Sequence, residues 1–141
     1  MSRSGYSYDC ENIGLWRQAV ERAVKGRRGQ KALALITKAL DAMPDKQLAA
    51  NSFQSDCGPC TFGALAQLLG IDTSDLEAKP GLDEDYVDRD EVGRRFDVAP
   101  SMAAEIMFLN DEGCVYSESP AQRWQRMRRV IDDMMEGRWH A

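Results

Sequence analysis

The residues best suited to chemistry are two cysteines in the run Cys57-Gly58-Pro59-Cys60. Thiols at this spacing are typical of disulfide exchange, in which Cys57 would be the attacking thiolate and Cys60 would resolve the mixed disulfide. A thioredoxin fold places β-rich segments on both sides of such a pair, whereas helical patterns flank this one. Thiol–disulfide redox chemistry at Cys57 and Cys60 is therefore an alternative hypothesis.

The same segment resembles the nucleophile segment of papain-like and bacteriocin-processing cysteine peptidases. That chemistry needs an imidazole to activate the thiol. The chain has one histidine, His140, next to its last residue. A chain terminus is a poor place to hold a general base, and Gln54 lies closer to Cys57 than the resemblance expects. These features disfavour a peptidase.

Cys57 and Cys60 also have the spacing of zinc ligands, but a structural zinc site needs four ligands. Cys10, Cys114 and His140 could complete one only through a fold that the sequence does not reveal. A simpler interpretation makes Cys60 a small buried residue on the first turn of a helix and places Cys57 in the loop before it. We expect no metal and no cofactor.

The helix that follows this run has clear boundary signals. Pro59 suits the first turn of a helix, where its missing N–H is not needed. A broad apolar face follows, and Gly70 is a left-handed stop with apolar Ile71 behind it. The strongest helix is the last one, in which Ser119 is the N-cap and Pro120 the first helical residue.

Apolar residues recur at helical spacing in most of the remaining chain. Between Lys46 and Asp56 this period weakens, which leaves room for a short strand and a tight turn near Ser55. We predict a mainly α, single-domain bundle of five to six helices over residues 1–141, with one short β-hairpin near 46–57. Residues 1–10 are expected to form an extended N-terminal arm.

Composition limits the classes of function. The 141 residues carry a net charge of −5, with a pI near 4.9. This balance argues against a general phosphate-binding protein but does not exclude a local basic face. Between the first two expected helices, Gly26 and Gly29 bracket a basic corner of Lys25, Arg27, Arg28 and Lys31. No apolar run approaches the roughly 20 residues that span a bilayer. Without a secretion signal pattern, we expect a cytoplasmic protein with reduced thiols.

Residues 72–91 hold nine acids against two cations, a charge of −7. Such a segment can be a solvated face. It can also be an acidic patch that engages a basic groove on another protein by imitating nucleic-acid phosphates, since complementary fields speed encounter and fix orientation. The residues that we assign to partner binding are Asp83, Glu84, Asp85, Asp88, Asp90 and Glu91.

Two further polar groups have simple interpretations. Glu105 with the run 110–112 could suggest a hard-metal site, but an ordinary polar helix end explains these residues equally well. Arginines recur along the last helix, and we expect most of them on a solvated face with acidic neighbours. They are Arg123, Arg126, Arg128, Arg129 and Arg138.

Several separated motifs occur together in this chain: the opener Met1-Ser2-Arg3-Ser4-Gly5-Tyr6-Ser7 with Asp9-Cys10, the run Leu40-Asp41-Ala42-Met43-Pro44, Cys60 with Gly63-Ala64, the run Asn110-Asp111-Glu112, and the closing Pro120, Arg123-Trp124 and Met127-Arg128. Together they resemble a family of small uncharacterised phage and prophage proteins. The resemblance implies a cysteine at the place of Cys60 and none at Cys57, so that the dithiol is individual to this chain. It implies no catalytic residues.

A phage setting implies a class of function, because small acidic accessory proteins of phages commonly bind and block host machinery. We therefore expect a non-enzymatic module that binds a host protein, with a nucleic-acid-targeting defence such as a CRISPR effector as the candidate target. Neither direct nucleic-acid contact nor membrane contact is expected, and self-association stays open. A redox protein and a structural or assembly component of a virion are the alternatives.

Overall fold

The computed structural model describes residues 3–5, 13–77, 87–114 and 117–139. Within them the chain forms six α-helices, one 3-10 helix and one small antiparallel sheet, which confirms the mainly α, single-domain prediction. The helices are α1 (Ile13–Lys25), α2 (Arg27–Ala42), α3 (Thr61–Leu69), α4 (Arg89–Phe96), α5 (Pro100–Glu112) and α6 (Pro120–Met135), with η1 (Ser74–Leu76) between α3 and α4. The strands are β1 (Gln54–Ser55) and β2 (Gly58–Pro59).

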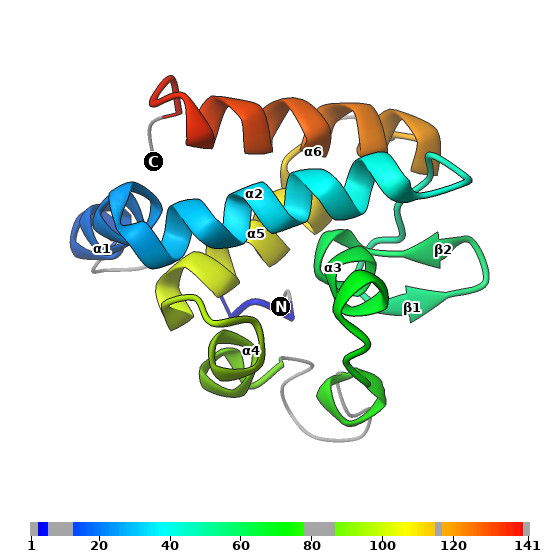
Figure 1. The fold of residues 1–141 in the computed structure, drawn as a ribbon, viewed down its shortest axis with the longest axis horizontal. Coiled ribbons are helices and arrows are strands. Elements are labelled where there is room, and N and C mark those ends of the chain that lie inside the picture. The colour runs from blue at the N-terminus through cyan, green and yellow to red at the C-terminus, as the bar shows by residue number, and fades with distance from the viewer. Residues whose placement is uncertain (1–2, 6–12, 78–86, 115–116, 140–141) are drawn as a thin grey trace.

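Two helices, α2 and α5, form the centre of the bundle. α2 contacts α1, α3 and α6, while α5 contacts α1, α3, α4 and α6. Figure 1 shows α6 lying along α2, α5 behind α2, and α3 with the hairpin at the end opposite α1. Six of the largest fully buried side chains come from these two helices, and burial of each contributes about 1.5–3 kcal/mol. They are Leu33, Ile36, Leu40, Met102, Ile106 and Met107.

The predicted hairpin is present, with strands closer to the cysteines than expected. Ser55 pairs with Gly58, so Asp56 and Cys57 form the turn. The two strands are short, and the segments beside them extend the pairing, since the Cys60 N–H donates to the Phe53 carbonyl over 3.1 Å.

Pro59 is not in the first turn of α3, so that expectation was wrong. Its carbonyl accepts a hydrogen bond of 2.8 Å from the Ala49 N–H, which keeps the backbone extended through this point. The helix begins only at Thr61, and Cys60 is its N-cap instead of a first-turn residue.

The predicted helix ends agree with the structure where the local signals are strong. Gly70 has a φ of 70° and is the left-handed C-cap of α3. Ser119 and Gln122 form a capping box at the start of α6, with Pro120 as its first residue. In both places a short local pattern is sufficient to position the boundary.

α3 lies unusually close to the hairpin. A Cβ atom on Gly63 would be 2.0 Å from the Phe53 carbonyl oxygen, so only glycine allows this approach. The contact sets the start of α3 against the segment that precedes β1. No helix in the described part of the chain has both the length and the apolar character needed to cross a bilayer.

Candidate functional site

A buried ion pair joins the start of the chain to the last turn of α5. The Arg3 guanidinium donates to the Asp111 carboxylate from Nε over 2.7 Å and from Nη2 over 3.1 Å. The side chains are only 2% and 0% exposed. The Arg3 backbone carbonyl also accepts a 2.7 Å bond from the Val87 N–H. Arg3 and Ser4 are therefore buried in the body, and Gly5 after them is exposed; this segment lies in the middle of the view in Figure 1.

Asn110 extends this polar cluster. Its Oδ1 accepts from the Thr61 hydroxyl over 2.8 Å and from the Thr61 backbone N–H over 3.1 Å. Its Nδ2 donates to the Ala49 carbonyl and to the Asp111 carboxylate, each over 2.9 Å. The fully buried amide thus joins the end of α5, the start of α3 and the segment before the hairpin, and all of its polar capacity is used in doing so.

Cys60 borders the same cluster. Its Sγ accepts a 3.4 Å bond from the Gly63 N–H, which caps α3, and the residue is 1% exposed. Burial by itself lowers the pKa of Arg3, but Coulombic attraction to Cys60 and Asp111 outweighs this and raises that pKa above its ordinary value. The Arg3 guanidinium also lies 4.9 Å from the centre of the Phe53 ring. The expectation of a buried Cys60 is confirmed.

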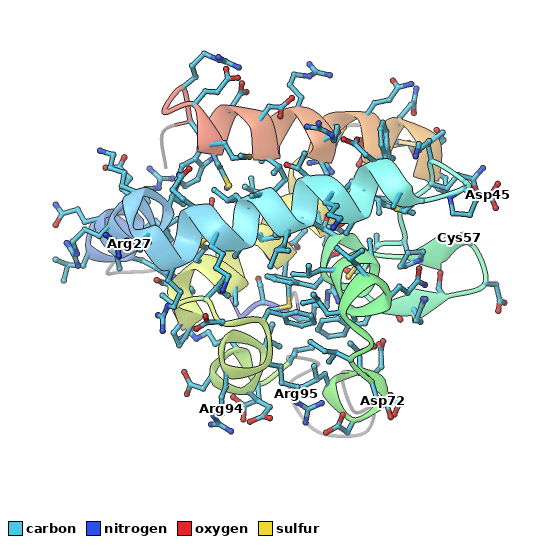
Figure 2. All side chains as sticks on the ribbon, viewed as in Figure 1. Arg27, Asp45, Cys57, Asp72, Arg94 and Arg95 are labelled. Carbon is cyan, nitrogen blue, oxygen red and sulfur yellow. The ribbon has the colours of Figure 1, made fainter. Side chains whose placement is uncertain are left out.

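Cys57 lies in a different environment, at the exposed turn of the hairpin. Its Sγ is 3.1 Å from the Ser55 hydroxyl oxygen. Figure 2 labels it at the hairpin end of the molecule. It borders an open hollow of about 250 Å³ whose lining includes Asp45 and Gln67. The chain between the two cysteines is largely extended and spans on the order of 10 Å, beyond the roughly 7 Å limit for a disulfide. In this conformation the two thiols do not share a site.

Of the six residues assigned to partner binding, the structure describes three. Asp83, Glu84 and Asp85 lie outside the described residues. Asp88 is the N-cap of α4, and its Oδ1 accepts from the N–H groups of Asp90 and Glu91 over 3.1 and 3.3 Å. Asp88, Asp90 and Glu91 therefore lie together at the N-terminal end of α4, where the positive end of the helix dipole favours carboxylates.

Arg95 brings the two described parts of the acidic segment together. It donates from Nη1 to the Asp75 carboxylate over 2.7 Å and from Nε to Glu91 over 2.9 Å. Hydrogen bonds to Asp75 and then Glu91 raise the pKa of Arg95 above its ordinary value. Figure 2 shows Arg95 between α4 and the loop that carries Asp72. Acids from η1 and α4 thus meet at one end of the molecule.

One acid of this segment has a structural role. Glu77 accepts hydrogen bonds from the Phe53 N–H, the Gln54 N–H and the Ser52 hydroxyl, over 2.7, 3.2 and 2.9 Å. This carboxylate ties the chain after η1 to β1. It contributes less than a free carboxylate would to any surface that meets a partner.

Two arginines of α6 differ from the expected solvated face. Arg126 donates to the carbonyl oxygens of Leu109 and Asn110 over 2.6 and 3.1 Å and pairs with Glu118 over 2.7 Å. Arg123 donates to the Leu48 carbonyl over 2.8 Å. Both are part-buried groups that satisfy backbone carbonyls, which a helical spacing pattern does not reveal. Arg128 fits the expectation and pairs with acids on α2 and α6. Arg129 is exposed, and Arg138 lies beyond the end of α6, where it pairs with Asp133.

The polar run at the end of α5 is a structural element. Within the described residues no group of three or more Cys, His, Asp or Glu side chains is placed to hold a metal ion. Asn110 and Asp111 bind protein groups instead, and Glu112 is exposed. The role of Arg3 had no signal in the sequence, because a single arginine in a small polar opener has no distinguishing pattern.

Comparison with known proteins finds no matching family model, no matching curated protein and no matching solved structure.

Proposed function

We propose that this chain is a non-enzymatic phage or prophage accessory protein that acts in the host cytoplasm by binding a host protein. The candidate target is a nucleic-acid-targeting defence complex such as a CRISPR effector. The acidic segment of residues 72–91 is the proposed binding element. A protein that handles nucleic acid carries a basic groove, and acids held in a fixed arrangement can occupy that groove in place of phosphates.

The observation that supports this proposal is the bridge made by Arg95 between Asp75 and Glu91. It draws acids from both ends of the segment to one end of the molecule. Beside this bridge, Asp88 and Asp90 are exposed and form no ion pair with any described residue. Prearranged surface charge increases the rate of association with an oppositely charged partner and sets its orientation.

The first experiment tests the segment with matched variants. One variant carries Asp83→Asn, Glu84→Gln, Asp85→Asn, Asp88→Asn and Asp90→Asn. Asparagine still accepts hydrogen bonds at an N-cap, so α4 keeps its start. The control variant removes the same charge elsewhere on the surface, through Asp45→Asn, Asp56→Asn, Glu112→Gln, Asp133→Asn and Glu136→Gln.

Each protein is immobilised and exposed to host lysate at low salt, and the retained proteins are identified. We expect the wild type and the control to retain the same basic host protein, and the acidic-segment variant to lose it. Equal retention by all three proteins would remove the segment from the proposal. Failure of the wild type to retain any specific host protein would overturn the proposal.

A second experiment tests the target class. Cells with an active CRISPR effector directed against a reporter phage are made to express the wild type, the acidic-segment variant or the control. Inhibition would raise the plating efficiency of the targeted phage with the wild type and the control alone. An unchanged plating efficiency with all three would exclude the effectors tested as targets, and the protein retained from lysate would then define the class.

A further inference from the structure

We propose that the exposed face of α2 is a binding surface for the phosphate backbone of nucleic acid. Three cations define this surface, which we call the basic stripe: Arg27, Lys31 and Lys38. The inference does not depend on the proposed function, because it concerns a different face of the molecule and a different class of partner.

The basic stripe follows directly from the helical repeat. Successive positions along it differ by four, three and four residues when exposed Ala34 is included, so all four side chains lie on one line of the helix. From Arg27 to Lys38 this line is roughly 16 Å long. That is about the length of five base-pair steps at roughly 3.4 Å per step. Figure 2 shows Arg27 at one end of α2.

These three cations form no ion pair or side-chain hydrogen bond with the part of the chain that the structure describes. Among the described residues no carboxylate lies within ion-pair distance of Arg27, Lys31 or Lys38. At the corner beside them, Lys25 is likewise exposed and unpaired with described residues, and Arg28 meets Asp97 only at 3.9 Å. Arg27 and Arg28 also occupy the first turn of α2, where the helix dipole disfavours positive charge.

Several arginines elsewhere on the surface have a carboxylate partner. Arg94 pairs with Glu91, Arg128 pairs with Asp41, and Arg138 pairs with Asp133. Arg94 on α4, Arg128 on α6 and Arg138 beyond the end of α6 therefore have carboxylates that neutralise their field, whereas Arg129 on α6 is exposed and forms no ion pair with a described residue. On α2 three cations without such partners among the described residues lie on one line of the helix, and this alignment distinguishes the stripe from a single unpaired arginine such as Arg129.

The corner that carries the stripe is tightly packed. A Cβ atom on Gly29 would lie 1.9 Å from the Ala23 carbonyl oxygen, so α1 and α2 meet at van der Waals distance there. On its other sides α2 packs against α3 and α6. The cations are therefore presented on a fixed support, and binding would require little ordering of the backbone.

The chemistry of the stripe favours nucleic acid over an acidic protein. Protein interfaces are built around buried aromatic or aliphatic anchors and are depleted in lysine. Among the described residues the large apolar side chains that are exposed are Leu15 and Leu69, and neither lies on α2. Cations aligned on one helix face without an apolar anchor match the contacts made to a phosphate backbone, which position a partner without reading its sequence.

The net charge of −5 does not contradict this assignment, although it led us to expect no nucleic-acid contact. Residues 72–91 account for −7, which leaves +2 for the remainder of the chain. Counterion release depends on the cations in contact with phosphates and much less on distant acids, which salt screens beyond a Debye length of about 10 Å.

The test is fluorescence polarisation with a short fluorescein-labelled DNA duplex of mixed sequence, over a range of salt concentrations. Three to four phosphate contacts predict a slope of log K against log salt of about −3 to −4. The affinity should therefore fall about 100-fold between about 50 mM and about 200 mM salt. Substitution of the stripe by Arg27→Gln, Lys31→Gln and Lys38→Gln should make the slope shallower by about 3.

The matched control removes three cations from other faces through Arg94→Gln, Arg129→Gln and Arg138→Gln, with the same change in net charge. It should keep the affinity and the slope of the wild type, and circular dichroism on heating should show that all three proteins are folded. No binding by the wild type at about 50 mM salt, or equal losses in the stripe variant and the control, would overturn the inference. Tighter binding of a polyglutamate peptide than of the duplex would overturn it in favour of an acidic protein partner.

Discussion

The Arg3 guanidinium holds the Asp111 carboxylate through two hydrogen bonds, with both side chains almost completely buried. Asp111 also accepts a 2.9 Å bond from the Asn51 N–H. One carboxylate therefore connects the third residue of the chain, the segment before the hairpin and the last turn of α5. Loss of either charge would leave the other buried without the opposite charge that compensates it.

Arg3→Met should lower the free energy of unfolding by about 3–5 kcal/mol, because it leaves the Asp111 charge buried and uncompensated. Adding Asp111→Asn should cost much less than the sum of the two single changes, since the amide keeps an acceptor and removes the charge. Urea denaturation of the four proteins in the double-mutant cycle measures this coupling. Additive effects within about 0.5 kcal/mol would show that the pair does not act as a unit.

Two glycines that flank α3 should respond very differently to alanine. Gly63→Ala places a Cβ atom against the Phe53 carbonyl and should cost about 3 kcal/mol or more of stability. At Gly70 the space is open and only the positive φ opposes a side chain, so Gly70→Ala should cost about 1 kcal/mol. Thermal unfolding of both variants measures the difference. Similar costs would mean that α3 can move away from the hairpin.

The Glu118–Arg126 pair should make stability depend on acid. The Arg126 hydrogen bond holds the pKa of Glu118 below its ordinary value. Glu118 therefore stabilises the fold above its unfolded-state pKa of about 4.3, and this contribution disappears as the pH falls through the lower folded-state value. Glu118→Gln should lose about 1–2 kcal/mol at neutral pH.

The control for this prediction is the decrease in stability as the pH falls below neutral, which we call the acid limb. Urea midpoints measured between neutral pH and pH of about 3 should fall less steeply for Glu118→Gln than for the wild type. An equally steep fall in both proteins would show that other carboxylates govern acid unfolding. Arg126→Gln should flatten the acid limb in the same way, because the pKa of Glu118 would return toward its ordinary value.

The two cysteines of the Cys57–Cys60 run should differ in accessibility to alkylation. Iodoacetamide should modify exposed Cys57 in the folded protein, and Cys60 at least about 100-fold more slowly, because it requires local opening. Peptide mapping by mass spectrometry measures both rates. Equal rates, or rapid formation of a Cys57–Cys60 disulfide without loss of structure, would restore the redox hypothesis.

The sequence by itself determined the mainly α class and several helix ends. Gly70 and the Ser119 capping box are local signals, because each depends on residues within one turn of the boundary. The hairpin was also predictable in kind. Its register was not, and Pro59 was assigned to the helix because nothing local shows that its carbonyl is held by Ala49.

Only the tertiary structure decided which polar residues meet. Arg3 and Asp111 are 108 positions apart, and neither has a neighbour that indicates the pairing. Arg95 likewise collects acids from η1 and α4, and Cys60 becomes a buried cap while Cys57 remains exposed. The physical reason is range: periodicity and capping act over a few residues, whereas packing of distant segments determines which charges and thiols become neighbours.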